Sequence, residues 1–232
     1  MFTYNGVMLG YFFMKSKFFL QVITVVLNLF AFCIQANSAP VAKNEAVQWA
    51  NSAGEQLIKA LGSHNLKNKY IVLDKMFADD VDGDYIARFV IGKYWKEMSP
   101  EQKQSYTALF KRYMLSLYKN YPLDFETNEI NYNITSAQEG KLHTAVFCTV
   151  TLPEKLASEN FDHVNLEFTL TKDNGKIKIR DLKIGESSLL LTYRGRFYQM
   201  MKDADEDLLW FLEDLETLTV SNERNAEEKL NQ

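Results

Sequence analysis

Cysteine, which forms disulfide crosslinks, and proline and glycine, which interrupt helices and strands, are scarce in this sequence. Its 232 residues include only 2 cysteines, 4 prolines and 10 glycines. Two cysteines are too few for the disulfide framework that small secreted domains use. The shortage of proline and glycine favours long regular helices and strands over a loop-rich scaffold. With 47% hydrophobic residues, the chain has enough apolar side chains for one sizeable core or two small ones.

Motifs that carry chemistry are also scarce. The chain has 3 histidines, His64, His143 and His163, and it contains no HExxH motif, paired CxxC motif or glycine-rich phosphate loop. His143 and His163 fall on neighbouring predicted strands, but no third ligand accompanies them. The aspartates between residues 79 and 84 lack a glycine and a glutamate at the spacings that a calcium loop requires. We therefore expect no catalysis, no metal and no cofactor.

The N-terminal segment has the three parts of a secretory signal peptide. Lys15 and Lys17 precede an apolar run over residues 18–34, and Ala36-Asn37-Ser38 supplies small residues for cleavage. We predict a signal peptide over residues 1–38 that is cleaved near Ser38. A membrane anchor is the alternative, but the run has three polar interruptions and is shorter than the ~20 residues of a span.

Export would leave a mildly acidic chain. The segment before Lys15 is unusual ahead of a signal, so we expect translation to start at Met14, or at Met8. Residues 39–232 carry 24 basic and 30 acidic residues, a balance that disfavours nucleic acid and anionic membrane surfaces as partners. Cys148 is the single cysteine left, and its alternation with apolar residues predicts a buried small hydrophobe.

The first half of the remaining chain is predicted to be helical. The expected helices lie over residues 47–61, 70–77 and 85–95. The clearest helix begins at the capping box Ser99-Pro100-Glu101-Gln102. It carries a wide apolar stripe from Tyr106 to Tyr118 and ends before Pro122.

The hydrophobic period changes from 3.6 to 2 after Asn128, which predicts strands. Asp173-Asn174-Gly175-Lys176 has the Asn-Gly pair of a type I′ hairpin turn. Helical spacing returns at Ser187-Ser188, read as a helix cap, and continues to Leu218. Residues 221–232 are polar and are expected to form a frayed tail.

These elements predict an α+β fold over residues 39–220. The sheet has about four antiparallel strands, each with one apolar face. That face must be covered, and the helices before and after the sheet are the available cover. We expect a single domain.

Two stretches resemble a known family. One is YIARFVIGKYW at residues 85–95, followed by SPEQK at 99–103. The other is IKIRDL at residues 177–182, followed by Gly185, Ser188-Leu189, Tyr193-Arg194 and Phe197. Over residues 45–218 the chain is similar to the MlaC family, also called the toluene-tolerance auxiliary proteins. It departs from the family pattern at Arg180, which replaces an aromatic residue, and at Glu186, which replaces a small one. Both departures are expected to alter the pocket entrance rather than the fold.

The resemblance implies a periplasmic phospholipid-binding protein. Such a protein shuttles lipid between an outer-membrane lipoprotein complex and an inner-membrane ABC transporter, and so maintains outer-membrane lipid asymmetry. It also implies a curved antiparallel sheet packed on helices around a deep apolar cavity. We expect a monomer whose partners are phospholipid and these two membrane complexes.

The cavity is predicted to lie between the apolar stripes of the helices and the sheet. The side chains expected to contact lipid are Phe89, Leu109, Phe110, Tyr113, Leu117, Val146, Val150, Leu166, Phe168, Tyr193 and Phe197.

Two other readings of the sequence stay open. One is a periplasmic interaction module or chaperone with a filled core. The other is an enzyme on a cone-shaped α+β fold of the ketosteroid-isomerase type, which needs an ionisable pair deep in its pocket. The stripes offer Tyr113 and Tyr193, but no obvious acid lies beside them.

Overall fold

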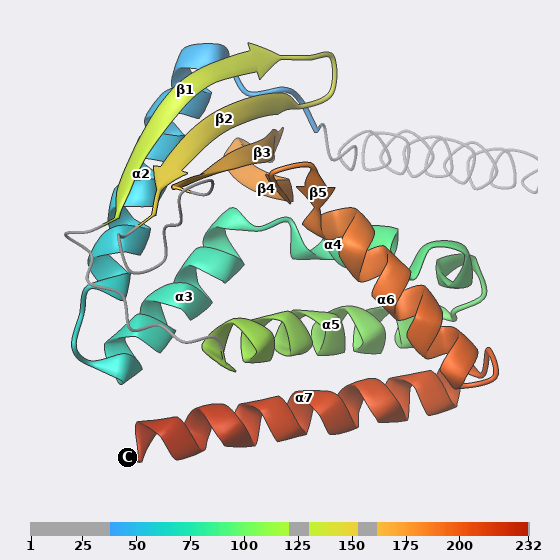
Figure 1. Ribbon diagram of the computed structural model, residues 1–232. Coiled ribbons are helices and arrows are strands. Elements are labelled where there is room, and N and C mark those ends of the chain that lie inside the picture. The colour runs from blue at the N-terminus through green and yellow to red at the C-terminus, as the bar shows by residue number, and fades with distance from the viewer. Residues whose placement is uncertain (1–37, 121–129, 153–161, 232) are drawn as a thin grey trace, which may run out of the picture. The chain divides into compact units, whose positions relative to one another are not determined.

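The computed structural model describes residues 38–120, 130–152 and 162–231 (Figure 1). All of these residues belong to one structural unit. The predicted signal peptide and start codons lie outside the described residues. Among the helices of the described ranges, none is long and apolar enough to cross a membrane.

Helices fill the chain up to residue 120. They are α2 (Lys43–Leu61), α3 (Leu66–Asp80), α4 (Gly83–Ile91), the 3-10 helix η1 (Gly92–Lys96) and α5 (Pro100–Asn120). The predicted capping box is confirmed at α5, where the Gln102 amide donates to the Ser99 hydroxyl and the Ser99 amide donates to the Gln102 side chain. Helix α3 begins earlier than predicted because Asn65 caps it, accepting a hydrogen bond from the Asn68 amide.

The second half contains one antiparallel sheet in the order β1-β2-β3-β4-β5. Its strands are β1 (Asn131–Glu139), β2 (Thr144–Thr151), β3 (His163–Asp173), β4 (Lys176–Ile184) and β5 (Ser187–Ser188). The predicted turn between β3 and β4 is confirmed, since Asn174 and Gly175 both have positive φ, at 48° and 79°. The predicted four strands are present, and the two-residue β5 is a fifth.

Two long helices complete the fold, α6 (Leu189–Asp203) and α7 (Leu208–Leu230). Ser188 caps α6 as predicted, since its hydroxyl accepts from the Leu191 amide at 3.1 Å. Residues 221–230, expected to be a frayed tail, instead continue α7. Polar residues there bind α5, a contact that the sequence alone does not reveal.

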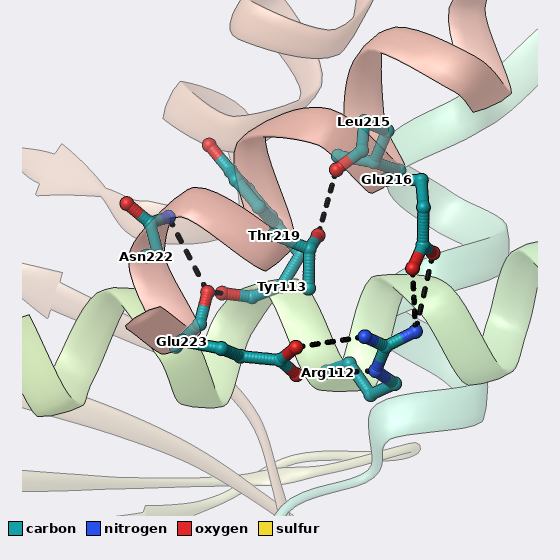
Figure 2. Close-up of polar contacts among 8 residues, drawn as sticks. Arg112, Tyr113, Leu215, Glu216, Thr219, Asn222 and Glu223 are labelled. Atoms are coloured by element: carbon teal, nitrogen blue, oxygen red, sulfur yellow. Dashed lines mark hydrogen bonds and ion pairs between the residues drawn. The ribbon is translucent and has the colours of Figure 1, made fainter. Parts of the chain in front are cut away.

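The contact between α5 and α7 is held by charge and by hydrogen bonds (Figure 2). The guanidinium of Arg112 on α5 contacts Glu216 at 3.0 Å and Glu223 at 2.8 Å, both on α7. These two carboxylates raise the pKa of the Arg112 side chain. The Asn222 side chain adds a hydrogen bond to the Ser116 hydroxyl at 3.3 Å. Because Glu223 and Asn222 lie beyond residue 220, these contacts fix the end of α7 on α5.

The apolar side chains form two separate cores. Helix α2 packs on one face of the sheet, where Ala46 and Ala50 meet Val146 and Leu170. The other core joins α4, α5, α6 and α7 around Phe197, a fully buried aromatic residue of α6. Figure 1 shows the helices of this second core beyond the β5 end of the sheet, away from the edge strand β1. The chain therefore builds two small cores and leaves space between them.

Candidate functional site

An apolar pocket of about 380 Å³ lies where the sheet, α2, α3 and the start of α6 meet. We call it the main pocket. Its apolar wall includes Trp49, Ala53, Leu57, Leu61, Leu73, Met76, Phe77, Val81, Ile86, Met114, Tyr118, Phe168, Ile179, Leu182, Leu189, Leu190 and Tyr193. Its volume falls in the usual range for small-molecule sites.

A second apolar pocket of about 250 Å³, the side pocket, adjoins the first between α2 and the sheet. The two pockets share wall residues from α2, α3, β3 and β4, namely Trp49, Ala53, Leu57, Leu61, Met76, Phe168 and Ile179. The side pocket extends along β1 and β2 to Ile130, Tyr132, Cys148 and Val150. Together they make a branched apolar space under the sheet.

The sequence of α2 explains why this space is present. Trp49, Ala53, Leu57 and Leu61 recur every four residues, so they share one helix face that points into the pockets. Gly54 lies beside this face, and a Cβ placed there would come within 2.8 Å of the Tyr132 ring. The missing side chain lets Tyr132 approach α2 and donate a hydrogen bond to the Asn51 carbonyl at 3.0 Å.

Charged side chains on the wall of the main pocket come from the end of α3 and from β4. They are Asp80, Arg180 and Asp181. Asp181 is occupied in holding the start of α6, because it accepts from the Ser188 hydroxyl at 2.7 Å and from the Leu190 amide at 3.0 Å. This gives a structural reason for the aspartate in the IKIRDL stretch.

Arg180 and Asp80 differ in the number of hydrogen bonds and ion pairs that their side chains make. Arg180 donates to Asp82 and to the Ser38 hydroxyl, both at 2.8 Å, and its guanidinium lies 4.3 Å from the centre of the Tyr85 ring. Burial raises the pKa of Asp80, and the neighbouring Asp79 carboxylate raises it further. Asp80 has no hydrogen bond or ion pair with the described part of the chain.

Cys148 is buried on the wall of the side pocket, as the sequence predicted. Burial raises the pKa of its thiol. The side chain is therefore mostly protonated at neutral pH and behaves as a small apolar group.

The structure brings together four of the predicted lipid-contact residues. Phe168 and Tyr193 line the main pocket, and Val150, Leu166 and Phe168 line the side pocket. All lie on strands or at the start of α6, where the apolar face of the sheet meets the helices. Contact of these residues with lipid stays a prediction.

The other predicted residues line neither pocket. Leu109, Phe110, Tyr113 and Phe197 are buried in the core of α4–α7, and Leu117 packs against it. Val146 belongs to the core under α2, and Phe89 stacks on Tyr85 and carries the Arg194 guanidinium over its ring. The apolar stripe of α5 correctly indicated burial. It did not reveal that α7 and α6, rather than a cavity, cover that stripe.

The sequence missed the contribution of α2 and α3 to the pocket wall. Leu57, Leu61, Leu73 and Met76 line the main pocket with Trp49, and none of these five was among the residues predicted to contact lipid. The helical spacing of these apolar residues on α2 and α3 was the signal that could have predicted their place on the pocket wall. In the described ranges, no three His, Cys, Asp or Glu side chains gather as metal ligands would.

Three comparisons place these features among known proteins. The family model for MlaC protein matches residues 52–216. The toluene tolerance protein ttg2D of Pseudomonas putida is 24% identical over 140 residues, which is 60% of this chain and 62% of that protein. The match therefore spans less than two thirds of the relative's length.

A solved structure shares the fold. It is a phospholipid-binding protein from Ralstonia solanacearum in complex with a phospholipid. The likeness has a TM-score of 0.58 at 16% identity, and it covers 75% of this chain and 96% of that one.

Proposed function

The chain belongs to the MlaC family, and we propose that it is a carrier that binds phospholipid in the two pockets under its sheet. The acyl chains occupy the branched apolar space, and the headgroup lies toward the charged residues of the main pocket. The similar Ralstonia solanacearum protein, which binds a phospholipid, supports this assignment.

The observation that carries the proposal is the apolar space left between two complete cores. Each methylene withdrawn from water stabilises a complex by about 0.8 kcal/mol. An acyl chain in the pockets gains this stabilisation, while the surrounding cores are already packed without it. The space is therefore suited to a ligand rather than to further side chains.

The proposal includes transport through the periplasm between an inner-membrane ABC transporter and an outer-membrane lipoprotein complex, as expected for the family. A bilayer stabilises acyl chains as well as the pocket does, so transfer between membrane and carrier is close to neutral in free energy. Direction then comes from the partner complexes.

Filling the pocket tests the proposal. Ala53 lies on the wall of both pockets, so Ala53→Phe places a ring where acyl chains would lie. We expect the variant to lose most of the lipid that co-purifies with the wild type, measured by mass spectrometry after extraction. Its free energy of unfolding should not fall, because the ring fills empty space.

Ala78→Phe is the matched control, since Ala78 is an exposed residue of α3 outside both pockets. It should keep the bound lipid. Equal lipid content in both variants would place the lipid away from residue 53, and severe destabilisation by Ala53→Phe alone would mean that this residue faces a filled core.

A further inference from the structure

The main pocket has a polar end at the junction of α3 with β4. Val81, just after α3, forms a bridge with Ile179 of β4, and the Asp82 amide donates to the Ile179 carbonyl at 2.9 Å. Asp80, the last residue of α3, comes just before Val81, and Arg180 follows Ile179 in β4; both line the main pocket. A carboxylate and a guanidinium thus line the pocket beside this bridge.

A β-bulge places Arg180 there. Thr169 pairs with Asp181 and Leu170 pairs with Ile179, so Arg180 is the extra residue of β4 and has no partner on β3. Bulges redirect side chains and recur beside functional sites. Two of its nitrogen atoms are used by Asp82 and Ser38, while Nη2 has no acceptor among the described residues.

The Asp80 carboxylate is half-buried, and none of the described residues donates a hydrogen bond to it. Lys178 and Lys75 lie close enough to act on its charge, but their ammonium groups bind other atoms: Lys178 donates to the Ala78 and Asp79 carbonyls, and Lys75 pairs with Asp79. Partial burial and the Asp79 carboxylate raise the pKa of Asp80 despite these two lysines. A cationic group on a ligand could donate directly to the Asp80 carboxylate and stabilise its charged form.

We propose that Asp80 and Arg180 form a headgroup site that selects phospholipids carrying a primary ammonium group, the ethanolamine class. This inference rests on the proposed function. The ammonium donates to Asp80, and the phosphate accepts from Nη2 of Arg180. Asp80 and Arg180 offer one charge of each sign to the zwitterion, because Asp181 is occupied in holding the start of α6 and Asp82 pairs with Arg180.

The site discriminates against two other headgroups. A glycerol headgroup has no ammonium, so a lipid that carries it brings a net negative charge toward Asp80 and gives no donor in return. A choline headgroup has a quaternary ammonium with no N–H, so it offers charge without a hydrogen bond. One hydrogen bond to a charged group corresponds to a preference of about tenfold.

Competition between headgroups tests the site. The delipidated protein is incubated with vesicles that hold equal amounts of phosphatidylethanolamine and phosphatidylglycerol with identical acyl chains, and the bound lipids are counted by mass spectrometry. We expect about tenfold enrichment of phosphatidylethanolamine on the wild type. Asp80→Asn, which keeps the side-chain shape, should bring the ratio close to one without reducing total lipid.

Asp214→Asn is the control, because Asp214 is exposed on α7 and lies outside the pocket walls. It should keep the enrichment. A second competition, phosphatidylethanolamine against phosphatidylcholine, uses the wild type alone, so it tests the headgroup preference even if Asp80→Asn does not fold. Phosphatidylethanolamine should again be enriched. Lipid bound without preference, or enrichment retained by Asp80→Asn, overturns the headgroup site while the carrier function stands. No lipid bound from either mixture overturns the carrier function itself.

Discussion

Cys148 offers a natural reporter inside the side pocket, because its thiol lies on the wall that acyl chains are proposed to cover. The thiolate is the reactive form, and burial raises the pKa of this thiol. At a given pH it should therefore react more slowly than an exposed cysteine, and its labelling should rise only at higher pH.

Lipid should slow that labelling further. In a Cys33→Ser background, we expect a maleimide to modify Cys148 much more slowly in lipid-loaded protein than in delipidated protein. An exposed reference thiol, Ala78→Cys in a chain without the other cysteines, should react equally in both states. Equal rates at Cys148 with and without lipid would place the acyl chains outside the side pocket.

Asp181 is predicted to matter for stability rather than for binding. It joins β4 to the start of α6 through the Ser188 hydroxyl and the Leu190 amide. Hydrogen bonds to a charged acceptor contribute roughly 1.5–3 kcal/mol each, so losing two of them in Asp181→Ala should lower the free energy of unfolding by about 3 kcal/mol or more. Urea unfolding followed by circular dichroism measures the change. The exposed control Asp79→Ala should have little effect, and a similar small effect at Asp181 would refute its structural role.

At the scale of elements, helix α7 is longer than its polar sequence suggested, and its last turns are expected to stabilise the helical layer. The Asn120 side chain donates to the Asn222 carbonyl at 2.7 Å, and Lys229 donates to the Asn120 carbonyl at 2.9 Å. Ala226 is buried in the same region.

Removing residues 221–232 removes these two hydrogen bonds together with the Glu223 ion pair and the buried Ala226, so it should lower the free energy of unfolding by about 2 kcal/mol or more. Thermal unfolding of the truncated protein, compared with one that lacks only residues 231–232, measures the loss. An unchanged midpoint would support the original expectation of a frayed tail. Lipid content should be the same in both, because the pocket walls lie elsewhere.

Local signals were sufficient to predict most of the elements. The capping box at Ser99 and the Asn174-Gly175 turn specify backbone geometry within four residues, so they could be read without knowledge of the fold. The cap at Asn65 carries the same kind of signal, but the weak apolar pattern before Tyr70 concealed the start of α3.

Contacts between distant elements could not be predicted in the same way. A helical stripe shows that a face is buried, but not what covers it, so Tyr113 and Phe197 were assigned to the cavity when they lie in the core of α4–α7. The bulge at Arg180 follows from the register of β3 against β4, which no local pattern reports. Of the pocket wall, the sheet residues were found and most of the helical ones were missed.

On the scale of the whole molecule, the division into two cores is the feature that suits a carrier. The core under α2 and the core of α4–α7 are each buried without a ligand, so the fold does not depend on lipid for its packing. Lipid that binds only the folded state still stabilises it by mass action. A carrier of this kind can release its cargo to a partner and remain folded.

Native mass spectrometry of the protein purified without detergent from a phospholipid-producing host tests the carrier function most directly. We predict a mass above that of the chain alone, with the difference resolving on extraction into diacyl phospholipid, and a mostly unloaded mass for Ala53→Phe. An unloaded wild-type mass, with no lipid taken up from vesicles, would contradict the carrier function and favour an interaction module with protein clients.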